Sequence, residues 1–92
     1  MTPFGRHNYR FVYDMTGNAE IILDIARLYP NRRIMEVVDI GVRNGVATTA
    51  TVHKELMWLN KNGYVKVVEE DGDKRSKLVK LTHKGKTFLE KL

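Results

Sequence analysis

Hydrophobic residues follow two spacings along the chain, first three to four residues apart and later two residues apart. The first spacing is typical of helices with one buried face, and the second of half-buried strands. The pattern predicts helices over about residues 17–29, 32–42 and 49–62, strands over 64–69 and 77–82, and a last helix over about 83–92. The residues expected to face the core are Ile21, Ile22, Ile25, Leu28, Ile34, Val37, Val38, Ile40, Val42, Val52, Leu56, Leu59, either Leu78 or the pair Val79 and Leu81, Phe88, Leu89 and Leu92.

Capping and turn residues support these bounds, because short polar side chains accept hydrogen bonds from first-turn amides. The candidate N-caps are Asn18, Thr48 or Thr49, and Thr82. The turn signals are Asn44-Gly45, Gly63 and Asp71-Gly72-Asp73. The order of elements predicts an α+β fold that is mainly α, a winged helix-turn-helix. It has a three-helix core, a two-stranded β-hairpin wing and a short C-terminal helix.

A chain of 92 residues is the size of one domain. We expect a single winged-helix domain over residues 16–92, preceded by an N-terminal arm over residues 1–15. The arm has no clean hydrophobic period. Its aromatic and basic residues are Phe4, Tyr9, Phe11, Tyr13, Arg6, His7 and Arg10.

The charge of the chain gives information about its binding partner. The chain carries 16 Lys and Arg residues against 11 Asp and Glu residues, a net charge of +5. Between residues 74 and 86 no acidic residue occurs, and the basic ones are Lys74, Arg75, Lys77, Lys80, Lys84 and Lys86. Such a cluster favours a polyanionic partner, most often nucleic acid. A solvated, lysine-rich surface explains the same cluster equally well.

Several classes of protein are disfavoured. The chain has 0 Cys, which excludes disulfides, thiolate zinc sites and cysteine nucleophiles. No apolar run approaches the roughly 18 residues of a membrane span, and the N-terminus lacks the apolar stretch of a secretory signal. His7, His53 and His83 have no metal-ligand spacing, and no phosphate-binding loop is present. We therefore expect a cytoplasmic, nucleoid-associated protein that is not an enzyme and uses no cofactor or metal.

Residues 46–85 resemble the recognition helix and wing of MarR-like winged-helix transcription regulators. The helix exit Leu59-Asn-Lys-Asn-Gly63-Tyr-Val and the wing pattern Asp73-x-Arg75, followed by Leu81-Thr-x-x-Gly85, carry this likeness. The resemblance implies DNA binding, with Arg75 at the wing position that reaches the minor groove or the backbone. It does not carry over dimerisation or ligand sensing, because the family's longer terminal helices have no counterpart in the short last helix.

The candidate DNA-binding residues come from the third helix and the wing. They are Thr48, Thr49, Ala50, Thr51, His53 and Lys54 in the helix, and Lys74, Arg75 and Lys77 in the wing. Hydroxyls and Lys54 can bond phosphates or base edges, and the methyl groups of Ala50 and Thr51 can contact thymine. Narrow minor grooves attract arginine electrostatically, which suits Arg75.

Some of these candidates also have a purely structural interpretation. Thr48 and Thr49 can act as caps alone. Arg75 can pair with Asp71 or Asp73 and so stiffen the hairpin. Lys54 can be a plain solvated lysine, and His53 a partly buried structural histidine.

Other polar and aromatic residues are assigned from their position alone. Trp58 is expected to pack under a neighbouring element, while Glu55 faces outward and Glu69-Glu70-Asp71 is solvated hairpin charge. Cations near a helix start are unfavourable in isolation, so they indicate a phosphate or carboxylate partner. These cations are Arg32, Arg33, Lys84 and Lys86.

The main hypothesis is a sequence-specific double-stranded DNA-binding protein, a transcription regulator that reads the major groove with residues 49–62 and holds DNA with the wing, residues 70–77. The alternative is a winged-helix adaptor that binds a protein partner in a transcription or replication complex, through an apolar surface near Met57 and Trp58. Binding to RNA or single strands is favoured only if the aromatic residues of the arm are exposed. A homodimer is possible through the first or last helix, and no membrane partner is expected.

Overall fold

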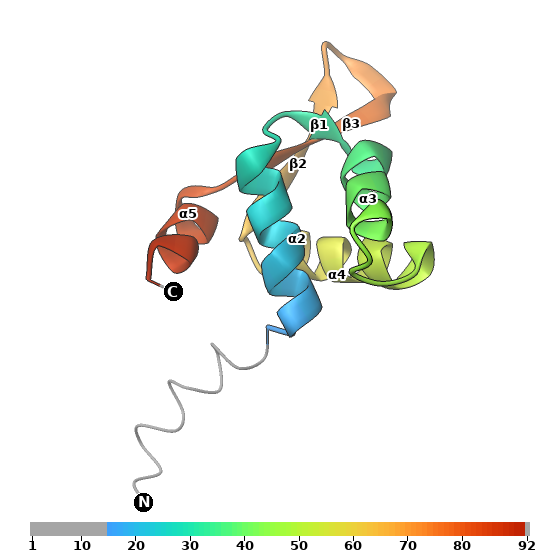
Figure 1. Ribbon diagram of the computed structural model, residues 1–92. Helices are drawn as coiled ribbons and strands as arrows, with labels where there is room; N and C mark the ends of the chain where they lie inside the picture. Colours follow the sequence, from blue (N-terminus) through green and yellow to red (C-terminus); the bar gives the residue numbers. More distant parts are fainter. Residues whose placement is uncertain (1–14, 92) are drawn as a thin grey trace, which may run out of the picture.

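The structure is a computed structural model that describes residues 15–91 (Figure 1). Its elements are α2 (Gly17–Leu28), β1 (Arg32–Arg33), α3 (Ile34–Arg43), α4 (Thr49–Lys61), β2 (Val65–Glu70), β3 (Asp73–Leu81) and α5 (His83–Glu90). The predicted winged helix-turn-helix is confirmed, with one strand more than expected. Residues 1–14 and Leu92 lie outside the described residues, so the arm, the domain boundary and the core position of Leu92 stay predictions.

Helices α2, α3 and α4 pack against one another around a shared hydrophobic core. Val52, Leu56 and Leu59 are each 0% exposed, as their spacing along the sequence predicts. Each such side chain stabilises the fold by roughly 1.5–3 kcal/mol relative to its exposed state. The buried face of α4 is therefore fixed, and the opposite face of the helix is exposed to solvent.

The predicted buried face of α2 is partly wrong. Ile22 is buried, but Ile21 and Leu28 are 48% and 56% exposed. The buried face instead includes Ala19 and Ala26, each 1% exposed. Small side chains allow helices to approach closely, and a pattern weighted by large apolar residues gives alanine too little importance. Leu23, which the pattern did not assign to the core, is also 0% exposed, so the buried face of α2 is formed by Ala19, Ile22, Leu23, Ile25 and Ala26.

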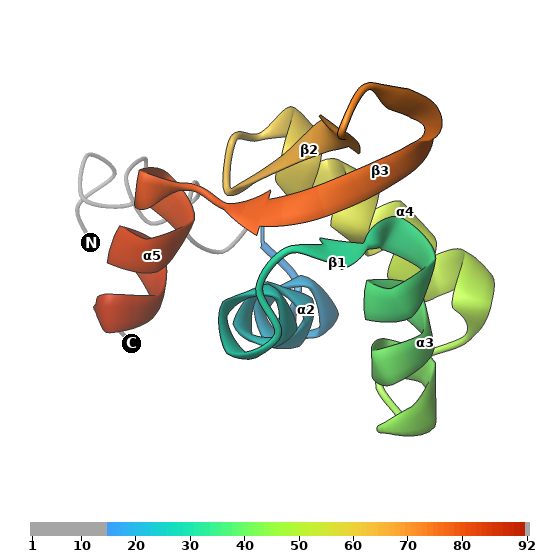
Figure 2. The ribbon, with the colours of Figure 1, turned by 90° about the horizontal axis from the view of Figure 1, so that it is seen from above.

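The sheet has three antiparallel strands in the order β1-β3-β2 (Figure 2). Val67 lies opposite Val79, which is buried as predicted. The second helix was expected to begin at residue 32, but Arg32 and Arg33 instead form β1, and Arg33 pairs with Leu78 of β3. A strand of two exposed residues leaves no hydrophobic period to detect. β3 also begins at Asp73, earlier than the predicted residue 77, and the register of its pairing with β2 shifts between Glu69 and Glu70.

Threonine hydroxyls cap three of the helices at their N-termini, namely α2, α4 and α5. The N-cap of α2 is Thr16 and not Asn18, since the Thr16 Oγ1 accepts a hydrogen bond of 3.0 Å from the Ala19 amide. The predicted cap at Thr82 is confirmed by a bond of 3.1 Å from the Gly85 amide. Each hydroxyl satisfies one first-turn amide, which contributes about 1 kcal/mol to the stability of the helix.

Aromatic rings join α4, the residue that precedes β2, and α5. Trp58 stacks on Tyr64 with ring centres 6.0 Å apart, and Phe88 meets Tyr64 edge to face at 5.6 Å. The structural interpretation of Trp58 is therefore confirmed. Lys84 was expected to need a phosphate or a carboxylate. Its Nζ instead lies 4.5 Å from the centre of the Tyr64 ring and donates to the Asn62 carbonyl at 2.8 Å, where it complements the negative C-terminal end of α4.

Gly85 is the point of closest approach between α5 and the sheet. A Cβ atom at this position would lie 2.2 Å from the Tyr64 carbonyl oxygen and 2.9 Å from a methyl carbon of Leu81. The carbonyl belongs to the backbone and cannot rotate away. Only glycine allows α5 to pack here.

We expect Gly85→Ala to destabilise the protein by about 1–3 kcal/mol, the usual cost of overpacking a filled interior. Gly17→Ala is the matched control, because a Cβ there meets nothing within 4 Å. That variant should be neutral or more stable by up to about 1 kcal/mol. Urea unfolding followed by circular dichroism measures both. Equal stability of the two variants would contradict the packing described.

Candidate nucleic-acid interface

The turn between α3 and α4 sets the direction in which α4 leaves the core. The Val46 amide donates to the Gly41 carbonyl at 3.0 Å, and Gly45 between them has φ of 73°, which favours glycine. Gly41 is buried, and a Cβ there would lie 3.0 Å from a methyl carbon of Val52. The backbone of α3 at Gly41 therefore packs closely against the Val52 side chain of α4, and the two helices form a helix-turn-helix.

Thr48 caps α4, which confirms the predicted cap, while a DNA contact by Thr48 stays a prediction. Its Oγ1 accepts from the Thr51 amide at 3.4 Å and donates to the Thr51 Oγ1 at 3.1 Å. Thr51 is half-buried, whereas Thr49 and Ala50 are exposed in the first turn. First-turn amides of a helix attract anions, so this end of α4 suits a phosphate group.

The exposed face of α4 carries no acidic group. Thr49, Ala50, His53 and Lys54 are all exposed, and their three- and four-residue spacing places them on one side of the helix. Glu55 was expected to face outward, but it is half-buried and accepts a hydrogen bond from the Thr16 hydroxyl. This bond ties α4 to the start of α2 and keeps the carboxylate away from the exposed face.

Only some of the cations of the wing are paired with a carboxylate within the described residues. The Asp73 Oδ1 accepts a hydrogen bond of 2.9 Å from the backbone amide of Arg75, so the expected Asp73 contact is with the main chain. Within residues 15–91 the Arg75 guanidinium has no carboxylate oxygen within 4.0 Å. Lys77 pairs with Glu69 at 3.8 Å, while Lys74 is exposed.

A shallow groove brings three of the predicted site residues together. His53 from α4 and Arg75 and Lys77 from the wing line it, together with the start of α3. Figure 1 and Figure 2 both place the wing turn and α3 away from α5, which lies at the other end of the molecule. The groove does not include the remaining predicted residues: Thr48, Thr49, Ala50, Thr51, Lys54 and Lys74.

Five groove residues were not among the predicted site residues: Arg33, Ile34, Met35, Asp73 and Ser76. Met35 is 59% exposed and lines the groove beside Arg33, which the sequence suggested only as a helix-start cation. The signal for Met35 was its position outside the predicted buried face of its helix. Nothing in the local pattern could place it beside the wing, because that proximity depends on the pairing of β1 with β3.

A carboxylate at the base of the wing holds the groove together. Glu70 accepts a hydrogen bond from the Ser76 hydroxyl and pairs with the Arg33 Nε at 3.1 Å. The Ser76 bond, followed by that of Arg33, lowers the pKa of Glu70, and Glu70 in turn raises the pKa of Arg33. Glu36 also accepts from the Arg33 amide at 3.0 Å. Glu70 is therefore a structural link between β1 and the wing, and the expectation of purely solvated charge was wrong for this residue.

We expect Ser76→Ala to raise the pKa of Glu70 toward the ordinary carboxylate range, since the largest cause of the shift is removed. Because the pKa of Glu70 is lower in the folded protein than in the unfolded chain, the ionised carboxylate stabilises the fold at pH values above the ordinary carboxylate pKa. This contribution to stability is lost as the pH falls through the lowered pKa. Carboxyl NMR titration of Glu70 measures the pKa directly. Thr87→Ala, on α5, is a control that should leave it unchanged; an unaltered Glu70 pKa in Ser76→Ala would contradict the bond.

No group of three or more His, Asp or Glu residues within residues 15–91 could hold a metal ion. No helix in that range is long and apolar enough to cross a membrane.

Comparison with solved structures places this fold in a known class. MarR from E. coli, in its apo form, has a TM-score of 0.71 and is 24% identical, with 91% of this chain and 59% of that chain covered. The transcriptional regulator Tm0710 from Thermotoga maritima has a TM-score of 0.68 and is 25% identical, over 97% of this chain and 69% of that one. BpsR from Bordetella bronchiseptica, whose DNA binding is regulated by 6-hydroxynicotinic acid, has a TM-score of 0.69 at 24% identity, covering 83% and 55%.

The chain is structurally similar to MarR-family transcription regulators over most of its length, which confirms the resemblance drawn from residues 46–85. The proteins matched are regulators and not enzymes. The chain spans less than two thirds of the lengths of MarR and BpsR. No protein-family model and no curated protein sequence matches it.

Proposed function

We propose that this chain is a sequence-specific, double-stranded DNA-binding protein that acts inside the cell as a transcription regulator. The observation that carries the proposal is the groove shared by His53 of α4 with Arg75 and Lys77 of the wing. In it, the exposed face of a helix adjoins a cationic hairpin. DNA recognition needs this combination, because base edges are read by a helix in the major groove while cations meet the flanking phosphates.

In this proposal α4 enters the major groove with its exposed N-terminal half. Lys54 bonds a guanine or a phosphate, and Ala50 meets the methyl group of thymine. Arg75 and Lys74, both exposed, contact the backbone or the adjacent minor groove. Thr51 is a weaker candidate than the sequence suggested, because its hydroxyl already bonds the capping Thr48.

The packing of α4 disfavours the adaptor hypothesis. That hypothesis needs an apolar surface around Met57 and Trp58, but both residues are half-buried and packed against the core. The exposed side of α4 is polar and basic instead, which suits a polyanion better than an apolar protein partner.

A homodimer fits a regulator of this kind, since two copies of α4 would meet half-sites about 34–36 Å apart. The first or the last helix was expected to supply the interface, and Phe88 and Leu89 of the last helix, α5, are half-buried against the core of their own chain. Part of each side chain remains available to a second copy. Sedimentation analysis of the full chain, free and with DNA, tests this assembly.

We expect Arg75→Ala to weaken binding to all duplexes alike and to reduce the slope of log K against log salt by about 0.9, the value for one phosphate contact. Lys61→Ala is the matched control, because Lys61 is an exposed cation at the other end of α4. Fluorescence anisotropy on a random-sequence duplex, from low to physiological salt, measures both slopes. If Arg75→Ala keeps the wild-type affinity and slope, the wing does not bind DNA.

Lys54→Ala is expected to relax sequence choice at one position, with about 1–3 kcal/mol of discrimination lost. Selection from a random duplex library with the wild type and the variant measures this preference. A single strand of the same length serves as the control ligand. Selection of the same site, with equal stringency, by both proteins would argue against base contact by Lys54. Negligible duplex binding by the wild type at low salt would remove the proposed function and favour the adaptor.

A further inference from the structure

His53 lies in the groove between α4 and the wing, beside two cations of the wing and one at the start of α3. Those cations are Arg75, Lys77 and Arg33. His53 is exposed, and within residues 15–91 its ring has no carboxylate oxygen within 4.0 Å. No ion pair in the described part of the fold therefore fixes the charge of this imidazole.

The neighbours of His53 on its own helix do not fix this charge either. Residues three and four positions away are its neighbours along α4. They are Thr49, Ala50, Leu56 and Met57, and none of them is ionisable. The adjacent Lys54 is exposed and positively charged. Histidine is the side chain whose charge ordinarily changes between about pH 5 and 8, so the charge of His53 depends on what enters the groove.

The cations that face His53 are held in place by carboxylates behind them. Arg33 pairs with Glu70 at 3.1 Å, and Lys77 pairs with Glu69 at 3.8 Å. The Arg75 guanidinium has no carboxylate oxygen within 4.0 Å in the described range of the chain. The groove thus offers fixed positive charge from the start of α3 and from the wing.

Little acid opposes an anion in this groove. Among the described residues that line it, only Asp73 is acidic, and its Oδ1 accepts a hydrogen bond from the Arg75 amide. Duplex DNA carries one phosphate charge per about 1.7 Å of its axis, so a duplex held by the wing brings phosphates to the groove. An opposite charge within about 4–6 Å favours the charged form of a titratable group. A phosphate beside His53 therefore favours the imidazolium.

We propose that His53 contacts a DNA phosphate as an imidazolium, so that duplex binding takes up a proton and strengthens as the pH falls. This inference rests on the proposed function and adds a means of regulating the same site. A neutral imidazole has one N–H donor and no charge, whereas the imidazolium has two donors and a positive charge. Because the complex holds more protons than the free protein, linkage requires its association constant to rise as the pH falls.

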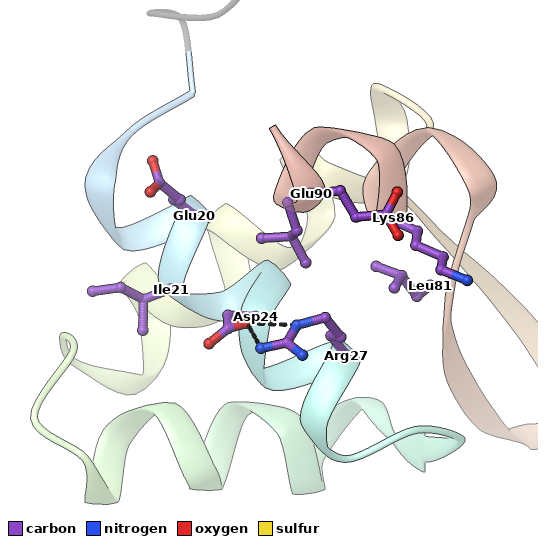
Figure 3. A pocket seen from close by; sticks show the side chains of 8 residues that line it. Glu20, Ile21, Asp24, Arg27, Leu81, Lys86 and Glu90 are labelled. Atoms are coloured by element: carbon purple, nitrogen blue, oxygen red, sulfur yellow. Dashed lines mark hydrogen bonds and ion pairs between the residues drawn. The ribbon is translucent and has the colours of Figure 1, made fainter. Parts of the chain in front are cut away.

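A second groove, between α2 and α5, has a different charge (Figure 3). Asp24 pairs there with Arg27 at 2.6 Å, and the ionisable residues that line the groove are Glu20, Asp24, Arg27, Lys86 and Glu90. Three acidic residues against two basic ones do not suit a polyanion. His83 begins α5, which lies away from the wing turn in Figure 1. It is therefore a control for a histidine outside the interface.

Fluorescence anisotropy of the full chain on a random-sequence duplex, from about pH 8 to about pH 6 at fixed ionic strength, tests the proposal. We expect the wild-type affinity to rise roughly three- to tenfold over this range, because a charge-assisted hydrogen bond is about twice as strong as a neutral one. The slope of log K against log salt should also steepen by about 0.9 at the lower pH, the value for one additional phosphate contact.

Two substitutions at His53 separate charge from shape. His53→Gln keeps a neutral donor and should bind at every pH as weakly as the wild type does at the upper pH. His53→Lys keeps a fixed charge and should bind at every pH about as tightly as the wild type does at the lower pH. The position is exposed and both new residues favour helices, so both variants should fold. A pH dependence that persists in His53→Gln would overturn the proposal.

His83→Gln and His7→Gln are the matched controls, because they remove the other two of the 3 histidines. Both should keep the pH dependence of the wild type, and its loss in either one contradicts the role of His53. Duplex binding with a steep salt slope but no pH dependence also contradicts this role, while it leaves the proposed function intact. Negligible duplex binding by the wild type at low salt and every pH removes the proposed function and this inference with it.

Discussion

Burial of one face of α4 is the constraint on which the rest of the structure depends. Val52, Leu56 and Leu59 are fully enclosed by α2, α3 and the sheet, and Gly41 allows α3 to approach Val52 closely. A helix with three completely buried residues at this spacing cannot rotate without exposing them to water. The outward direction of Lys54 and its neighbours is therefore a consequence of packing in the core.

Two acidic side chains near the candidate nucleic-acid interface are held by hydrogen bonds within the fold. Glu55 bonds Thr16, while Glu70 bonds Ser76 and Arg33. Both carboxylates have partners within the fold, so they oppose a polyanion less than free carboxylates would. The Glu70 contacts also connect β1 to the wing, which makes the position of the hairpin depend on the helix-turn-helix beside it. Electrostatics and architecture are thus coupled through the same few hydrogen bonds.

Much of the fold could be predicted from the sequence, because helical and alternating periods record which side of an element faces the core. The buried face of α4, the Thr82 cap and the hairpin were all recovered in this way. Errors arose where the deciding contact is distant or small. Thr16 caps α2 in place of Asn18, and the buried face of α2 includes Ala19, Leu23 and Ala26 but not Ile21. Of the candidate interface, the sequence found His53 and Arg75 but had no means of placing Met35 beside them.

The sequence by itself determined the order of elements, the cationic wing and the inner face of α4, because each depends on neighbours within a few residues of the chain. Only the tertiary structure decided the third strand, the link between Arg33 and Glu70, and the groove that joins α4 to the wing. These depend on residues 37 positions apart in the case of Arg33 and Glu70. No local period encodes such a contact, because it forms only when the pairing of β1 with β3 brings the two side chains within bonding distance.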